Sequence, residues 1–206
     1  MDARGVAELL LDAKALAFNV REPFTYASGI RSPVYVDCRL LISDVERRDI
    51  VVDSLADIVD GLDADVVAAT ASAGIPWGAW VADRLGMPLV YVRQSQKNHG
   101  KGKCVEGSAP EGSKAVVVED LVSTGGSSIH TVESLRGEGV GVEHCTAIFT
   151  YGLRESEDYF RAAEVALHSL SNLEAAIEAA VKRRYLTPEE ATEAKDWAKD
   201  PNRWRT

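Results

Sequence analysis

Two carboxylates, Glu119 and Asp120, follow an apolar run and lead directly into a small, hydroxyl-rich turn in the stretch VVVEDLVSTGGSS. Glycine allows the backbone to approach a ligand closely, and the free N–H groups at the start of a following helix attract anions. The turn therefore suits a phosphate dianion. The carboxylates would repel that charge and instead suit neutral hydroxyl groups nearby. A ribose 5-phosphate would satisfy both halves of the stretch.

A simpler alternative is that the turn only caps a helix and that the two acids are solvated. The ligand-binding interpretation is favoured because both acids stand at the end of an apolar strand with the turn directly after them. The stretch is not a Walker loop, since GxxxxGK[ST] is absent. The glycines of GEGVG (137–141) precede a strand rather than follow one, which indicates a helix-terminating turn rather than a dinucleotide site.

Basic side chains are concentrated in a second, glycine-bearing stretch, at Arg93, Lys97, His99, Lys101 and Lys103. Cations aimed at a leaving group with growing negative charge lower the barrier to its departure. A polar segment of this kind also suits a lid that closes and excludes water. The alternatives are a solvated surface loop with incidental lysines and, for His99, an ordinary surface histidine. Long loops without structure are uncommon unless they are functional or disordered, which favours the lid.

Short apolar runs alternate with amphipathic segments along the chain, and this pattern predicts the elements that position both stretches. Strands alternating with helices indicate right-handed βαβ units. The predicted fold is α/β, a doubly wound parallel sheet flanked by helices with a small N-terminal cap. We expect a single domain over residues 1–206, with the cap and base-side segment at 1–43 and the α/β core at 44–206. The predicted helices are 5–18, 44–62, 75–86, 127–139, 172–186 and 188–200, and the predicted strands are 34–40, 64–71, 87–93, 114–120, 142–151 and 164–170.

The composition excludes several classes of protein. The formal net charge is −9 over 206 residues, which argues against affinity of the whole protein for nucleic acid or an anionic membrane. The N-terminal stretch is charged throughout and no apolar run could cross a bilayer, so we expect a cytoplasmic protein. The three cysteines are widely spaced without a CxxC, and no two histidines have metal-ligand spacing. We therefore expect no disulfide framework and no metal site built by the protein alone.

The hydroxyl-rich stretch resembles the phosphoribosyl-pyrophosphate (PRPP) signature of the type I phosphoribosyltransferases. Other stretches narrow this resemblance to the orotate phosphoribosyltransferases. PFTYASGIRSPVYVDCRL (23–40) is similar to their base-side segment, ATASAGIPWGAW (69–80) to their pyrophosphate loop and YVRQSQKNHGKGKCVEG (91–107) to their mobile catalytic loop. AIFTYGL and WAKDPNRW are similar to one bacterial branch, so the resemblance runs nearly end to end.

The resemblance implies that orotate and PRPP are converted to orotidine 5-monophosphate and pyrophosphate, with Mg²⁺ held mainly through PRPP. It also implies a homodimer in which the catalytic loop of one subunit serves the site of the other. Arg93, Lys97, His99 and Asp120 are the implied catalytic residues, and Ser123 would also touch orotate. The implied PRPP-binding residues are Arg93, Lys97, His99, Glu119, Asp120, Leu121, Val122, Ser123, Thr124, Gly125, Gly126 and Ser127.

Three cations that many members of this family carry are missing, since Ala27, Ala73 and Gln94 occupy their positions. We expect Arg31 or Arg39 to supply replacement charge. The arginine that reads the orotate carboxylate has no clear counterpart, because Arg154 matches its position poorly. Tyr35 could either pack on the base or belong to the core, and the sequence leaves both roles open.

Two alternatives to this function stay open at the level of sequence. One is a phosphoribosyltransferase for another base, which the base-side segment 23–40 disfavours. The other is a non-catalytic regulator that only binds PRPP, which the retained Arg93, Lys97 and His99 disfavour.

Overall fold

A six-stranded sheet forms the centre of the computed structural model, which describes residues 1–26, 29–94 and 104–204. The strand order is β10-β9-β8-β5-β6-β7, with β7 antiparallel to β6 and the other neighbours parallel. The strands of this sheet are β5 (Val66–Thr70), β6 (Leu89–Val92), β7 (Val105–Glu106), β8 (Lys114–Val122), β9 (Gly141–Thr150) and β10 (Ala166–Asn172). The predicted fold class is confirmed.

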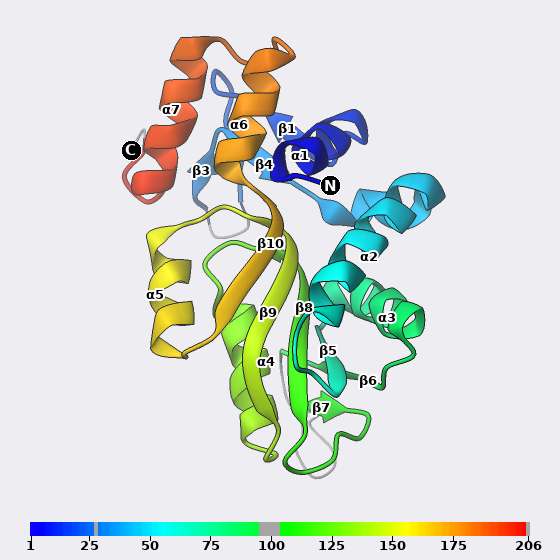
Figure 1. Cartoon of the computed structure of the whole chain (residues 1–206). Coiled ribbons are helices and arrows are strands. Elements are labelled where there is room, and N and C mark those ends of the chain that lie inside the picture. The colour runs from blue at the N-terminus through cyan, green and yellow to red at the C-terminus, as the bar shows by residue number, and fades with distance from the viewer. Residues whose placement is uncertain (27–28, 95–103, 205–206) are drawn as a thin grey trace.

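Helices cover both faces of the sheet (Figure 1). The helices are α1 (Ala3–Asp12), α2 (Val45–Asp60), α3 (Gly74–Leu85), α4 (Gly126–Arg136), α5 (Arg154–Ala162), α6 (Leu173–Lys182) and α7 (Pro188–Lys199). The chain passes outward from β5 through α3 to β6, and in the opposite direction from β8 through α4 to β9. The neighbouring strands β5 and β8 are therefore the topological switch point, where open α/β sheets bind their ligands.

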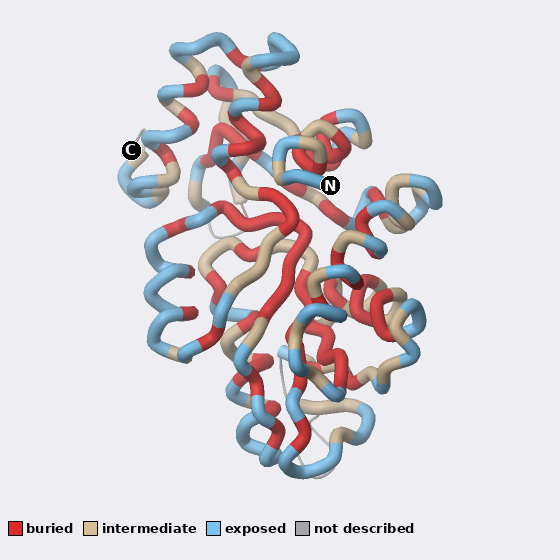
Figure 2. Tube along the Cα trace, viewed as in Figure 1, coloured by how far each residue is buried: buried red, intermediate tan, exposed pale blue. Residues whose placement is uncertain are grey.

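The apolar side chains form two clusters, one on each face of the sheet. Alternation along β8 sends Val116 and Val118 into the cluster under α2 and α3, and Val117 into the cluster under α4. Buried residues accordingly follow the central strands and the inner sides of the helices (Figure 2). Within the part of the chain that the structure describes, no helix has the length and apolar character needed to cross a membrane.

Helix starts were predicted accurately where a capping residue marks them. The Asp44 side chain accepts a hydrogen bond from the Arg47 N–H at the start of α2. Thr187 caps α7 in a reciprocal capping box with Glu190, and Pro188 occupies the first helical turn. These side chains satisfy backbone N–H groups that have no partner inside the helix, so the local signal and the observed boundary coincide.

The N-terminal segment departs from its predicted elements. The prediction of one helix over residues 5–18 is wrong beyond Asp12, because Lys14 takes a positive φ of 56° and the chain turns there. Residues beyond it form β1 (Leu16–Phe18), antiparallel to β4 (Val34–Val36). A hairpin of β2 (Phe24–Thr25) and β3 (Arg31–Ser32) lies between them in sequence. Pairing with a distant partner overrides the local helix propensity of this stretch.

Further elements differ from prediction in their bounds or were not predicted. The strand predicted over 34–40 ends at Val36, and the 3-10 helix η1 (Cys38–Ser43) follows because the Asp37 side chain caps it. The polar segment 94–113 contains β7, and α5 was not predicted at all. The strand predicted to end at Asp120 continues to Val122, since residues 121 and 122 pair with β9.

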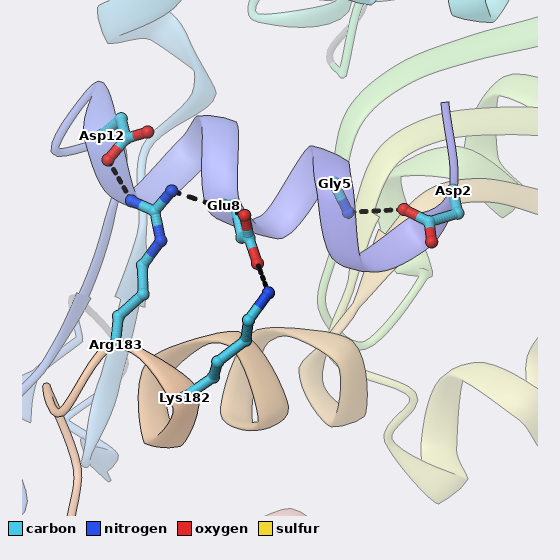
Figure 3. A network of polar contacts seen from close by, with 6 residues as sticks. All are labelled: Asp2, Gly5, Glu8, Asp12, Lys182 and Arg183. Carbon is cyan, nitrogen blue, oxygen red and sulfur yellow. Dashed lines mark hydrogen bonds and ion pairs between the residues drawn. The ribbon is translucent and has the colours of Figure 1, made fainter.

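Ion pairs join α1 to α6 across the surface (Figure 3). Glu8 lies 3.2 Å from Lys182 and 3.4 Å from Arg183, and Arg183 also pairs with Asp12. Lys182 and Arg183 lower the pKa of the Glu8 carboxyl, mainly through the Lys182 hydrogen bond. These groups are solvent-exposed, so we assign them a role in orienting the two helices rather than a large stabilisation.

Candidate active site

A cavity of about 510 Å³ opens at the carboxyl ends of β5, β8 and β9. Its wall is formed by residues 70–73 at the end of β5, by residues 119–121 of β8, by Ser123 and Ser127 of the turn and helix after it, and by Tyr151 after β9, together with residues of the N-terminal segment. The cavity thus lies at the topological switch point, where the fold predicts a ligand. Five of the nine predicted ribose-phosphate residues line it, namely Glu119, Asp120, Leu121, Ser123 and Ser127.

Glu119 and Asp120 form a closely coupled acidic pair on the cavity wall. One Glu119 oxygen accepts from the Asp120 N–H at 3.2 Å, and the other lies 3.4 Å from the Ser128 hydroxyl. Glu119 is 5% exposed, and burial followed by the charge of Asp120 raises its pKa well above the ordinary value. Burial also raises the pKa of Asp120. Two such acids favour partners that donate hydrogen bonds or carry positive charge.

The turn after β8 delivers the N-terminus of α4 to the cavity. Gly125 is the N-cap of α4 and has a φ of 86°, a conformation that only glycine adopts readily. A Cβ at this position would lie 3.2 Å from the Phe160 ring and 3.4 Å from Ser156. Glycine therefore lets the turn pack against α5, and the first turn of α4 that follows has backbone N–H groups without helical partners, which suit an anion. Of the remaining predicted residues, Val122 is buried in the core, whereas Thr124 and Gly126 lie beside the cavity without lining it.

We expect Gly125→Ala to raise the KM for a ribose-phosphate substrate about tenfold, since an alanine in the left-handed region costs about 1–2 kcal/mol and would shift the turn. Gly112→Ala is the matched control, because Gly112 has a φ of 81° with no atom near its missing Cβ and lies away from the cavity. Steady-state kinetics and thermal melts of both variants check this result. Equal KM values in the two variants would contradict the assignment of the turn.

The N-terminus of α3 forms a second anion-binding edge of the same cavity. Ala71, Ser72 and Ala73 line the wall just before the helix begins, and the peptide bond between Ala71 and Ser72 is cis. Gly74 packs so closely on β8 that a Cβ there would lie 2.7 Å from the Val118 carbonyl oxygen. Its small size therefore brings this helix terminus next to Glu119, and two positive dipole ends face one cavity.

Aromatic side chains of the N-terminal segment make the opposite wall. Tyr35 is 40% exposed and packs against Phe24 with ring centroids 5.5 Å apart. Because Tyr35 lines the cavity, its place in the structure favours the ligand-packing role over the core role. The hydroxyls of Tyr26 and Tyr151 are 2.9 Å apart, and burial raises the pKa of both phenols. Both tyrosines therefore stay neutral across the physiological pH range.

Arg39 is the cation among the described residues that line the cavity. Its guanidinium contacts the Asp37 carboxylate at 2.6 Å and 2.8 Å, and this bidentate pairing holds it in place. The same contact lowers the pKa of Asp37. Arg31 and Arg154, the other two arginines considered from the sequence, do not line this cavity. Ala73 lies on the wall, whereas Gln94 lies outside it and Ala27 lies outside the described residues.

The basic stretch is only partly described. Arg93 follows β6, and its side chain lies 3.0 Å from the Glu106 carboxylate on β7. Its backbone carbonyl lies 3.1 Å from the His130 ring, so His130 braces this position. Lys97 and His99 lie outside the residues that the structure describes. The roles assigned to all three cations stay predictions.

Sequence reasoning missed several residues of the aromatic and polar wall. Thr25, Tyr26, Asp37 and Tyr151 line the cavity without having been singled out. A signal was available for Tyr151, which is the last residue of the predicted strand 142–151, at its carboxyl end. The others come from short N-terminal strands whose position depends on tertiary pairing, so spacing alone did not reveal them.

Known proteins share this fold. The phosphoribosyl transferase domain family matches residues 44–182, and the chain belongs to that family. It is 43% identical over 205 residues to an orotate phosphoribosyltransferase of Coxiella burnetii, covering 98% of each chain. It is 45% identical over 201 residues to one of Listeria monocytogenes, covering 97% of this chain and 96% of the relative. The crystal structure of orotate phosphoribosyltransferase from Aeropyrum pernix aligns with a TM-score of 0.75 at 34% identity, over 88% of this chain and 99% of that one. Within the family, the chain is an orotate phosphoribosyltransferase, and the resemblance seen in the sequence is confirmed.

Proposed function

We propose that this chain binds PRPP and orotate in the described cavity and joins them to form orotidine 5-monophosphate, a step in pyrimidine biosynthesis. In this reaction a ring nitrogen of orotate gives up its proton to solvent and bonds to C1 of the ribose while the bond from C1 to the pyrophosphate oxygen breaks. Pyrophosphate leaves with the bonding electrons. The observation that carries the proposal is the convergence of two helix N-termini and an acidic pair on one cavity with an aromatic wall.

Each part of PRPP has a chemically matched surface in this arrangement. The 5-phosphate would be bound by the hydroxyls and N–H groups of residues 123–127 at the start of α4. The ribose hydroxyls would donate to Glu119 and Asp120. The pyrophosphate would lie at the start of α3, with Arg93, Lys97 and His99 neutralising the charge that grows on it. Ser123, at the junction of the two surfaces, would also touch orotate.

Magnesium fits the donors on the cavity wall. Mg²⁺ prefers hard oxygen ligands and keeps several waters, and Asp37, Glu119 and Asp120 place carboxylates on this wall. Since pyrophosphate oxygens would be adjacent, we propose that PRPP and water supply most of the ligands. The bound cation would screen the negative charge of PRPP, and Asp120 would meet it or the ribose hydroxyls from the floor of the cavity.

We further propose a cytoplasmic homodimer in which residues 93–103 of each chain serve the site of the other. Exposed apolar side chains on η1 and the start of α2 support an interface beside the cavity, namely Leu40, Val45 and Ile50 at 51%, 56% and 40% exposure. Residues 1–206 would act as one domain, with residues 1–43 as a cap on the base side of the 44–206 core.

A base-selection assay tests the proposal directly. The protein is mixed with PRPP, Mg²⁺ and one base at a time (orotate, uracil or a purine), and base absorbance is followed. Loss of absorbance with orotate alone is the expected result. Turnover of another base in place of orotate would indicate a phosphoribosyltransferase of different specificity. The absence of turnover with every base would indicate a PRPP-binding regulator and would overturn the proposal.

Arg39→Ala is expected to raise the KM for PRPP or orotate about tenfold, because both substrates are anionic and a hydrogen bond to a charged group contributes about 1.5–3 kcal/mol. Arg31→Ala is the matched control, since Arg31 is an exposed arginine of the neighbouring hairpin that does not line the cavity. Substrate titrations of the two variants provide the comparison. Unchanged KM values in Arg39→Ala would rule out this arginine as the replacement for the missing lysines.

A further inference from the structure

Trp197 of α7 is buried at 1% exposure directly behind the aromatic wall of the cavity. Helix α7 presents it because Ala191, Ala194 and Trp197 follow one another at helical spacing and are all buried. Its indole Nε1–H donates to the Arg31 carbonyl of β3 at 2.9 Å. A residue far along the chain thus fixes the backbone of the N-terminal hairpin, as the adjacent positions of α7 and β3 illustrate (Figure 1).

The same indole packs against the two tyrosines of the cavity wall. Its ring lies edge-on to Tyr151 at 5.6 Å and to Tyr26 at 6.4 Å, with interplanar angles of 73° and 85°. Edge-to-face packing of this kind is directional and favours one relative orientation of the rings. The Tyr26 hydroxyl also donates to the Val34 carbonyl at 2.8 Å. Both tyrosines are therefore held from behind by Trp197 and from the side by their own hydrogen bonds.

The hairpin that carries this wall has little support of its own. Its strands β2 and β3 contain two residues each, and an isolated two-stranded hairpin is at best marginally stable. The Trp197 hydrogen bond and the tyrosine packing are contacts that tie it to the sheet and to α7. Loss of either would loosen the part of the cavity wall that Thr25 and Tyr26 contribute.

We propose that Trp197 is a positioning residue for the base, which fixes Tyr26 and the hairpin so that orotate meets a preformed wall. The inference rests on the proposed function, because it requires that orotate binds against this wall. Trp197 does not line the cavity and contacts Tyr26, Tyr151 and the Arg31 carbonyl. Its effect should therefore fall on the base and spare PRPP, whose proposed contacts are at the starts of α3 and α4.

Trp197→Phe tests this proposal, since phenylalanine keeps an aromatic ring but loses the hydrogen bond to Arg31. We expect the KM for orotate to rise about fivefold, as loss of one hydrogen bond implies, while the KM for PRPP stays within twofold of the wild-type value. Hydrogen exchange of peptides covering β2 and β3, read by mass spectrometry, should become faster.

Val142→Ala is the control for a general loss of core packing. Val142 is 2% exposed at the amino end of β9, about 26 Å along the strand from the cavity end. This control should lower thermal stability without changing either KM or the exchange of the hairpin. In Trp197→Phe, equal changes in both KM values, or no change in either, would overturn the proposal.

Hydrogen exchange separates this inference from the proposed function. If the wild-type protein fails to use orotate, the proposed function is wrong. The positioning role is then tested by the hydrogen exchange of β2 and β3. Unchanged exchange of β2 and β3 in Trp197→Phe would overturn the positioning role whatever the base. Faster exchange, together with a raised KM for whichever base is used, would support it.

Discussion

Lys97→Ala is expected to lower kcat by about two to three orders of magnitude while leaving the fold intact. The expectation follows from the departure of pyrophosphate, since removing one group that stabilises developing negative charge typically costs about 10²–10³ in rate. Lys97 belongs to a polar stretch and lies outside the described residues, so no core contact is known to depend on it. Initial rates at saturating PRPP and orotate, with circular dichroism and a thermal melt, provide the measurement.

Lys114→Ala is the matched control for loss of a lysine. Lys114 is an exposed residue at the amino end of β8, paired with Asp63 at the opposite end of the sheet from the cavity. It should retain wild-type kcat, because surface ion pairs contribute little. Near-normal turnover in Lys97→Ala would contradict the catalytic role proposed for the basic stretch.

Mixing Lys97→Ala with Glu119→Gln tests whether the stretch serves a neighbouring subunit. In a shared-site homodimer, hybrid molecules would regain one intact site, and about a quarter of wild-type activity would return. If each chain serves its own site, mixing would restore nothing.

Glu119→Gln is expected to weaken catalysis and at the same time to stabilise the unliganded fold. Burial and the neighbouring Asp120 raise the pKa of Glu119, so the folded protein binds its proton more tightly than the unfolded chain does. The stabilising contribution of this group is therefore complete below its ordinary pKa of 4.5 and is lost as pH rises through the elevated pKa. Glutamine has the same shape but does not ionise, so the variant does not lose stability as pH rises.

The amide would keep part of the local hydrogen bonding. Its oxygen can still accept from the Asp120 N–H, and its nitrogen can donate to the Ser128 hydroxyl, which now faces it across 3.4 Å. The ribose hydroxyls, by contrast, would lose a charged acceptor worth about 1.5–3 kcal/mol. We therefore expect kcat/KM for PRPP to fall about ten- to a hundredfold.

Thermal melts of wild type and Glu119→Gln across pH 4 to 9 check the stability half of this prediction. The difference in Tm should be small near pH 4.5 and grow toward neutral pH in favour of the variant. Each 1 kcal/mol would appear as about 2–4 °C for a domain of this size. A variant less stable than wild type at pH 8 would show that the charged carboxylate stabilises the empty site.

The sequence predicted the elements that carry strong local signals. Central strands such as β5 are buried on both faces and therefore read as uninterrupted apolar runs. Capping residues such as Asp44 and Thr187 satisfy helix N–H groups locally, so helix starts were found. The turn after β8 was singled out for the same reason, because its glycines and hydroxyls are contiguous, and Ser123 and Ser127 of that stretch line the cavity.

Apart from α5, whose acidic first turn was a local signal that was overlooked, the elements that were missed depend on distant partners. Strands β1 and β7 are three and two residues long, and each is defined by pairing across the sheet rather than by its own residues. The aromatic wall and its support combine Tyr26 and Tyr151 with Trp197 behind them, and these residues are separated by more than a hundred residues from first to last. No periodicity links such residues, and only the folded chain brings them together.

The wall of the cavity and its support are built from segments inside and outside the domain-family match. The domain-family match covers residues 44–182, which hold the phosphate-binding turn and the acidic pair. The hairpin and α7 lie on either side of that region, joined to each other by the Trp197 hydrogen bond to Arg31. A relative with a different base specificity could keep the sequence of the central region and change the sequences of the hairpin and α7. Both would have to change together, because Trp197 of α7 packs on the hairpin and donates a hydrogen bond to it.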